Sequence, residues 1–195
     1  MVIDKPSGLL SVAGNKPFLQ DCLESRAKEK FPSALIVHRL DKDTSGVIVL
    51  ALNKKAHANL GKQFENRQTK KTYIARVFGV MKDDEGQVDE PIFTDWVNRP
   101  KQKIDYENGR NAVTNWQIIN KEKNATRVQL NPITGRSHQL RVHMLHLGFP
   151  ILGDNLYAHD EALMFASRLQ LHALKLSFFH PSNTQECFFE ATCPF

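Results

Sequence analysis

Runs and alternations of apolar residues along the chain predict several strands. Residues 47–52 are all apolar and three of them are β-branched, which is typical of a strand buried on both faces. Along 72–80, Tyr73, Ala75 and Val77 alternate with side chains of the opposite face, as in a strand with two different faces. Similar patterns predict further strands at 113–119, 126–130, 171–179 and 186–192.

Helical spacing marks three other segments. Residues 18–30 and 54–68 carry apolar side chains three or four positions apart. A third helix is expected at 137–147, with Thr134 or Ser137 as its N-cap and Gly148 at its end. Because helices are few and strands many, the pattern favours a single α+β domain over 1–195, with a mixed, mostly antiparallel central sheet and flanking helices.

Composition narrows the class of protein only a little. The net charge of +5 and the pI of about 9.1 are compatible with a phosphate-rich partner. The three cysteines form no CxxC pair, which argues against a disulfide framework or a Cys-rich zinc site and favours a cytoplasmic location. The sequence has neither a signal-peptide pattern nor an apolar run that approaches the length of a membrane span.

The first residues read as the end of a strand. The apolar run 1–3 passes directly into a turn at 4–8. We therefore expect that the native N-terminal strand is missing from this sequence.

One polar segment lies between two apolar runs. Residues 38–46, from His38 to Gly46, separate the apolar stretches 34–37 and 47–50. Functional groups are often carried on loops of this kind, which rigid elements hold on both sides. The alternative is a solvated turn in which Asp and Thr side chains cap the backbone.

Two further segments carry cationic side chains at positions where they could bind phosphate. Residues 131–143 lead from a strand into a helix N-terminus, where Arg136 makes phosphate binding plausible. In the segment 96–103, Arg99, Lys101 and Lys103 alternate, and in an extended chain they would lie on one side and suit a phosphate backbone. Taken singly, each segment is better explained by a solvated surface.

Other kinds of site are poorly supported. His143 and His146 lie three residues apart, but no nearby Cys or Glu completes a metal site. The sequence contains no GxGxxG, P-loop or GxSxG motif. Ser45 and His38 lack a marked third member of a catalytic triad.

Taken together, the polar segments resemble the three motifs of the RluA family of pseudouridine synthases. The matching residues are His38–Asp41 with Thr44–Gly46, then Lys71–Tyr73, then Gly135–His143. Residues 4–9 and 148–154 resemble flanking signatures, and all of them occur in the family's order. The segment 95–103 and the short chain resemble a member that acts on both 23S ribosomal RNA and transfer RNA.

The resemblance implies an isomerase that converts uridine to pseudouridine in structured RNA. Its substrates would be a 23S ribosomal RNA hairpin and the anticodon stem-loop of transfer RNA, bound in a cleft of the pseudouridine synthase fold. The reaction would need no cofactor and no metal, and the enzyme would be a monomer.

The resemblance also implies a role for each matched residue. Asp41 would be the catalytic carboxylate, Tyr73 would pack on the target base, and Arg141 would pair with Asp41 at salt-bridge distance. Such a cation would keep Asp41 ionised against the effect of burial. Arg39 would fill the gap left when the target base leaves its stack. The residues expected to bind RNA are Arg39, Arg99, Lys101, Lys103, Arg136, His138 and Gln139.

Two other functions stay open at this point. A non-catalytic RNA-binding module would keep the cations but could dispense with Asp41. A glycosidase or nuclease would need a second carboxylate at a defined separation, and Asp43 is the only near one.

Overall fold

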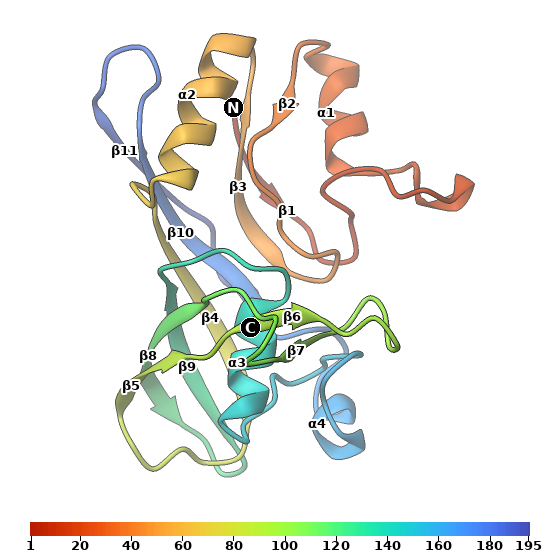
Figure 1. Cartoon of the computed structure of the whole chain (residues 1–195), viewed down its shortest axis with the longest axis vertical. Coiled ribbons are helices and arrows are strands. Elements are labelled where there is room, and N and C mark those ends of the chain that lie inside the picture. Colours follow the sequence, from red (N-terminus) through yellow and green to blue (C-terminus); the bar gives the residue numbers. More distant parts are fainter. The chain divides into compact units, whose positions relative to one another are not determined.

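The computed structural model describes residues 1–195 and divides them into two compact units. Unit 1 consists of residues 1–71 and 172–194, and unit 2 consists of residues 72–171 and Phe195. Each unit has its own strands and helices (Figure 1), and each has its own core of buried apolar side chains.

The strands of unit 1 are arranged around β3 (Ser45–Ala51), in which every residue is buried. β1 (Val2–Lys5) and β2 (Leu35–Ile36) pair with it antiparallel, and β10 (Leu171–Phe179) pairs with it in parallel. β11 (Glu186–Glu190) adds to β10 antiparallel. The continuous apolar run of β3 is thus explained by its place inside the sheet.

Two α-helices stand on the two sides of β2 and β3 in Figure 1. α2 (Lys54–Glu65) starts after Asn53, whose side chain caps it, and buries Leu60 against β3 and β10. α1 (Leu23–Lys30) begins later than predicted, because Cys22 and Ser25 form a capping box that fixes its start. Ahead of it lies only a short 3-10 turn, η1 (Pro17–Leu19).

The strands of unit 2 follow the order β4, β9, β8, β5, all antiparallel. Their bounds are β4 (Lys70–Phe78), β9 (Ala125–Pro132), β8 (Val113–Lys121) and β5 (Glu85–Asp89). A separate hairpin, β6 (Ile92–Thr94) with β7 (Gln102–Ile104), was not predicted. β3, β4, β8, β9 and β10 agree with the sequence pattern.

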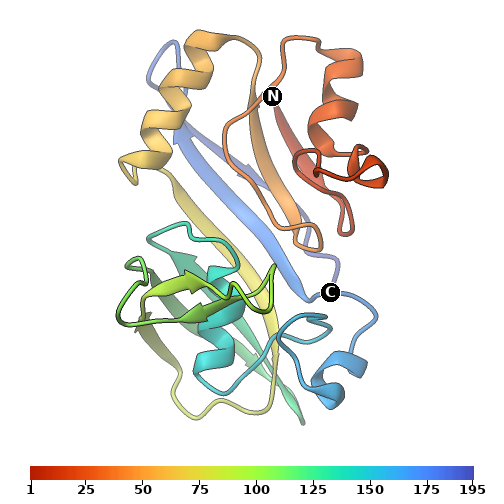
Figure 2. The same ribbon diagram turned by 45° about the vertical axis from the view of Figure 1, so that its right-hand side comes forward.

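α3 (Gln139–His146) lies on one face of the unit 2 sheet and buries Leu140 and Met144 there. Figure 2 shows the β6–β7 hairpin beside it, and α4 (Asp160–Met164) is a separate short helix. The prediction that Thr134 or Ser137 caps α3 is wrong. The N-cap position is His138, in the left-handed conformation at φ 54°, and the Thr134 hydroxyl instead accepts from Val113 N.

The fold class predicted from the sequence is confirmed. The molecule is α+β, with strands that are mostly antiparallel and with one parallel pair, β3 and β10. No helix has the length and apolar character needed to cross a membrane. The assignment of residues 1–195 to a single catalytic domain stays a prediction.

Candidate active site

Asp41 lies in the loop between β2 and β3, and a buried lysine forms a hydrogen bond to the backbone of that loop. Lys5 has no solvent exposure. Its ammonium donates to the carbonyl oxygens of Pro6 at 3.0 Å, Leu9 at 2.7 Å and Lys42 at 3.0 Å. Because a buried charge must be matched by polar partners, these carbonyls and Lys5 fix one another.

Three further contacts fix the loop backbone on both sides of Asp41. Gly8 N donates to the Lys42 carbonyl at 2.9 Å, and the Ser7 hydroxyl donates to the Asp43 carbonyl at 2.7 Å. The buried Ser11 hydroxyl bonds both the N–H and the carbonyl of Leu40. Residues 5–11 therefore act as a clamp on the loop, and they position the half-buried Asp41 through contacts with the backbone of its neighbours.

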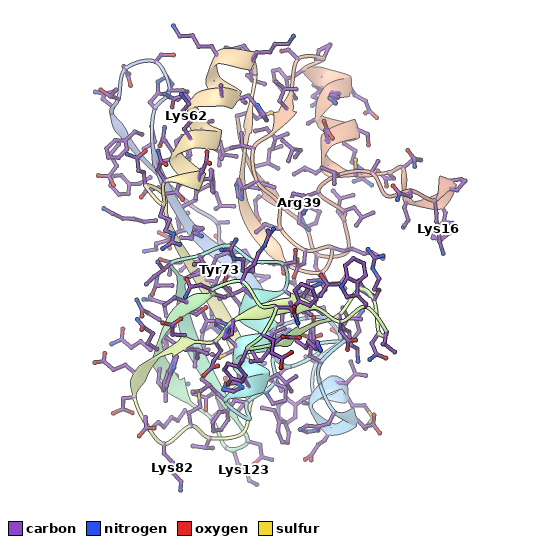
Figure 3. The ribbon with its side chains drawn as sticks, in the orientation of Figure 1. Lys16, Arg39, Lys62, Tyr73, Lys82 and Lys123 are labelled. Atoms are coloured by element: carbon purple, nitrogen blue, oxygen red, sulfur yellow. The ribbon has the colours of Figure 1, made fainter.

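The start of the same loop is fixed by His38. Its Nε2 accepts from Val49 N at 3.1 Å, and its ring stacks on Phe64 with centroids 4.4 Å apart. Burial, helped by the positive charge of Lys71, lowers the pKa of His38 to about 3. The imidazole is thus neutral and serves as an acceptor for the backbone. Arg39, next along the chain, is exposed and labelled in Figure 3.

Tyr73 lies in β4, opposite Leu130 of β9 (Figure 3). Its half-buried ring packs on the unit 2 core together with Ala75 and Val77, the face predicted from the alternation. Two residues earlier, burial and the nearby charge of Arg67 lower the pKa of Lys71 to about 8.

Arg141 comes from the first turn of α3, as predicted, and its guanidinium is held by Asp154. The two side chains are 3% and 0% exposed. Arg141 Nε donates to Asp154 Oδ2 at 2.7 Å, and its Nη2 donates to Oδ1 at 2.6 Å. This two-point geometry fixes the plane of the guanidinium. The expected pairing of Arg141 with Asp41 stays a prediction.

Tyr157 connects three parts of unit 2. Its ring lies 5.1 Å from the Arg141 guanidinium carbon. Its hydroxyl accepts from Gln102 N of β7 at 2.8 Å and lies 2.7 Å from His138 Nδ1. A single hydroxyl thus joins β7 to the residue that precedes α3.

Gln139 is buried, and its amide serves the protein's own backbone. Its Oε1 accepts from Arg136 N and from the Thr134 hydroxyl. Its Nε2 donates to the Val113 carbonyl and the Thr114 hydroxyl. The sequence suggested an RNA contact, but at 4% exposure Gln139 shapes the turn that presents its neighbours. Arg136 itself is half-exposed and donates to the Asn111 carbonyl.

The expected row of Arg99, Lys101 and Lys103 is not an extended strand. Arg99 lies in a turn at residues 97–100, where its guanidinium stacks on Trp96, and only Lys103 belongs to β7. Lys103 pairs with Asp105 at 3.1 Å. The proline and polar residues that suggested an extended segment instead build a hairpin loop.

Three residues of this arrangement were missed by sequence reasoning: Lys5, Asp154 and Tyr157. Lys5 and Asp154 fall within the flanking signatures at 4–9 and 148–154, so the signal was present. Nothing in the spacing connects Asp154 to Arg141, because the turn that brings them together is a property of the folded chain.

Residues 1–146 match the family described as RNA pseudouridylate synthase. The chain therefore belongs to this family, and it is a pseudouridine synthase, an isomerase. The predicted resemblance to the RluA family is confirmed by relatives of that name. The chain is 58% identical over 182 residues to the dual-specificity RNA pseudouridine synthase RluA of Yersinia pestis, a match that covers 93% of this chain and 88% of that protein.

Other similar proteins support the same family assignment. The protein of the same name from Escherichia coli (strain K12) is 51% identical over 196 residues, which covers 100% of this chain and 90% of that one. Human RNA pseudouridylate synthase domain containing 1 matches with a TM-score of 0.84 at 27% identity, over 100% of this chain and 80% of that one. Human RNA pseudouridylate synthase domain containing 4 matches with a TM-score of 0.78 at 30% identity, over 99% and 85%.

Proposed function

We propose that this enzyme converts specific uridines to pseudouridine in 23S ribosomal RNA and in the anticodon stem-loop of transfer RNA, with Asp41 as its catalytic carboxylate. The observation that carries the role of Asp41 is the clamp on its loop. Lys5, Ser7, Gly8 and Ser11 fix the backbone on both sides of a half-buried carboxylate. A scaffold of this kind holds a reacting group in one geometry.

The reaction accounts for the need for one ionised carboxylate. The bond from N1 of the base to C1′ of the sugar breaks, the base turns, and a bond from C5 to C1′ forms. A proton leaves C5 and N1 gains one, so atoms and electrons balance within the nucleotide. A carboxylate can carry the intermediate covalently, which divides one difficult step into easier ones.

Other residues take the roles that the sequence resemblance implies. Tyr73 and Arg141 serve the same reaction as Asp41. Arg39 is exposed on the catalytic loop, which suits a side chain that takes the place of an extruded base. The side chains proposed to contact RNA elsewhere are Arg99, Lys101, Lys103, Arg136 and His138.

The proposal extends to the state of the enzyme in the cell. We place it in the cytoplasm as a monomer, where the thiols of Cys22, Cys187 and Cys193 stay reduced.

The variant Asp41→Asn tests the role of Asp41, because it removes the charge and keeps the shape. We expect tritium release from 5-tritiated uridine to fall at least a thousandfold, with RNA affinity unchanged within about threefold. Asp43→Asn is the matched control, since it makes the same change two residues away in the same loop, and it should stay within about threefold of the parent. Turnover by Asp41→Asn within tenfold of the parent would contradict the assignment.

Ribosomal and transfer RNA substrates are tested separately. The purified enzyme should release tritium from both a 23S ribosomal RNA hairpin and a transfer RNA anticodon stem-loop. Activity on only one of them would limit the proposal to that RNA and leave the role of Asp41 untouched.

A further inference from the structure

The loop that joins β6 to β7 is rigid although it lies on the surface. Asp95 N donates to the Lys101 carbonyl and Lys101 N donates to the Asn98 carbonyl, both at 3.0 Å. The Asp95 carboxylate accepts from the backbone and the side chain of Asn98, at 3.2 and 2.9 Å. The loop thus closes on itself, and its shape is set before any partner arrives.

The hairpin is also anchored at its base. Gln102 N of β7 donates to the Tyr157 hydroxyl at 2.8 Å, and Thr94 donates to the Gln102 side chain at 3.2 Å. Ile92 of β6 and Ile104 of β7 pack in the small core that includes Val142 of α3 and Tyr157. These contacts at the base of the hairpin fix the position of the loop within unit 2 (Figure 2).

The tip of that loop presents an indole ring to solvent. Trp96 is 62% exposed and Val97 is 91% exposed, whereas Trp116, the second of the chain's two tryptophans, is 8% exposed. The Arg99 guanidinium carbon lies 4.7 Å from the Trp96 ring centroid, so the cation stacks on the ring. With Arg99 stacked on it, Trp96 still leaves ring surface exposed to which a flat partner can bind.

The chemistry around the ring favours one kind of partner. Arg99 and Lys101 bring two positive charges to the loop, against the single negative charge of Asp95, whose oxygens accept hydrogen bonds from Asn98. An unpaired nucleotide offers both a flat aromatic base and a phosphate. Aromatic side chains beside cations bind single-stranded bases in this way, with stacking that tolerates any base.

We propose that Trp96, braced by Arg99, is a stacking platform for an unpaired base in the loop of the RNA substrate. The inference rests on the proposed function, because it assumes an RNA hairpin as substrate. It adds a binding site at the tip of the β6–β7 hairpin, where Lys101 neutralises the phosphate next to the stacked base. Val97, although more exposed, has no aromatic face and takes no part in stacking.

Tryptophan fluorescence tests the platform directly. In the variant Trp116→Phe, Trp96 is the only tryptophan, so the emission reports on that ring alone. Titration with a transfer RNA anticodon stem-loop should quench this emission. A fully paired RNA duplex of the same length has no unpaired base and should quench it much less.

Affinity measurements with the parent protein give an independent answer, should Trp116→Phe fold poorly. Trp96→Leu should bind the stem-loop about tenfold more weakly, since stacking on one base has that order of effect. Trp96→Phe should recover most of the loss, and Val97→Ala, the control at the same tip, should bind like the parent. For Trp96→Leu we expect KM to rise more than kcat falls, because the ring holds RNA and does not react.

Several outcomes would overturn the inference. Stem-loop binding by Trp96→Leu at the parent's affinity, or binding without a change in Trp96 emission, would show that no base stacks there. Quenching by anionic lipid vesicles but not by RNA would assign the tip to a membrane surface. If the parent releases tritium from RNA in those cases, the proposed function survives and only the platform fails. If the parent neither binds nor modifies RNA, both fail.

Discussion

Asp154 is a charged residue with no contact with water, and one guanidinium balances it. Its two oxygens accept from Arg141, and Oδ1 also accepts from the backbone N–H groups of Leu156 and Tyr157. A buried charge left without its partner is far more costly than an exposed one. This carboxylate therefore supports the proposed site by holding Arg141 in place, at a position that sequence spacing did not reveal.

The variant Asp154→Asn leaves Arg141 buried with no matching charge. We expect the free energy of unfolding to fall by about 3 to 5 kcal/mol, measured by urea denaturation. Asp21→Asn is the matched control, because Asp21 makes the same two-point contact with Arg26 but at the surface. It should leave the urea midpoint unchanged. Equal effects of the two variants would show that burial does not govern the Arg141 pair.

His38 predicts a dependence of stability on pH. Its pKa is about 3 in the folded protein, against 6.5 for an ordinary histidine. Below pH 6.5 the unfolded chain binds a proton that the folded chain does not, so stability is fully present above pH 6.5 and is lost as the pH falls toward 3. One such group contributes a slope of at most about 1.4 kcal/mol per pH unit.

The variant His38→Gln removes this group and keeps an acceptor near Val49 N. Urea denaturation between pH 6.5 and 5 should give a shallower loss of stability for the variant than for the parent. His143, whose pKa is lowered chiefly by burial, acts in the same direction and leaves a residual slope. Parallel curves for parent and variant would mean that His38 titrates normally in the folded state.

Among the elements, the parallel pair β3 and β10 depends on one glycine. Gly46 lies opposite Ala173 at φ 111°, and a Cβ there would lie 2.2 Å from the Ala173 carbonyl oxygen. No side chain fits without moving the backbone of β10. Gly8 also has a positive φ, 84°, but a Cβ there would meet nothing within 4 Å.

Alanine variants at these two glycines distinguish the effect of steric crowding from the effect of backbone strain. Gly8→Ala should lower the free energy of unfolding by about 1 to 2 kcal/mol, the cost of the left-handed conformation alone. Gly46→Ala should lower it by more than about 3 kcal/mol, because the strands must also part. Thermal denaturation followed by circular dichroism measures both. Similar losses for the two variants would argue against close contact of the strands at Gly46.

An element can be predicted from the sequence when the residues that stabilise it lie within its own segment. It is missed when its support comes from residues far along the chain. β3 was found because its apolar run records burial directly, and β4 because its two faces differ. β6 and β7 were not, since each has three residues and their support comes from α3 and Tyr157, far along the chain. The start of α3 was misplaced because Thr134, a plausible N-cap, accepts from Val113 N of β8 instead.

At the scale of the whole molecule, the net charge of +5 predicts an affinity for RNA that falls with salt. Each phosphate that the protein neutralises steepens the log–log salt dependence by about 0.7 to 0.9. Lys101→Gln should therefore reduce the slope by about that amount, measured by filter binding of a stem-loop at several salt concentrations.

A surface lysine outside the proposed contacts serves as the control. Lys123 lies in the turn between β8 and β9 and is labelled in Figure 3. Lys123→Gln changes the net charge equally and should leave the slope as it is in the parent. The same reduction for both variants would indicate a diffuse effect of total charge, not a phosphate contact at Lys101.

The division of unit 1 into two stretches of chain bears on how the protein is made. Ser45 of β3 and its bonded partner His172 of β10 are 127 residues apart, and all of unit 2 except Phe195 lies between them. A ribosome adds roughly 5 to 20 residues per second, so β3 waits many seconds for β10 after it has been synthesised. During that time one edge of β3, a strand that is wholly buried in the folded protein, has no partner, and such edges readily join other chains. Unit 2, apart from Phe195, is one continuous stretch and can form in the interval. The strand that follows the Asp41 loop is thus synthesised early, but it pairs with β10 only late in synthesis.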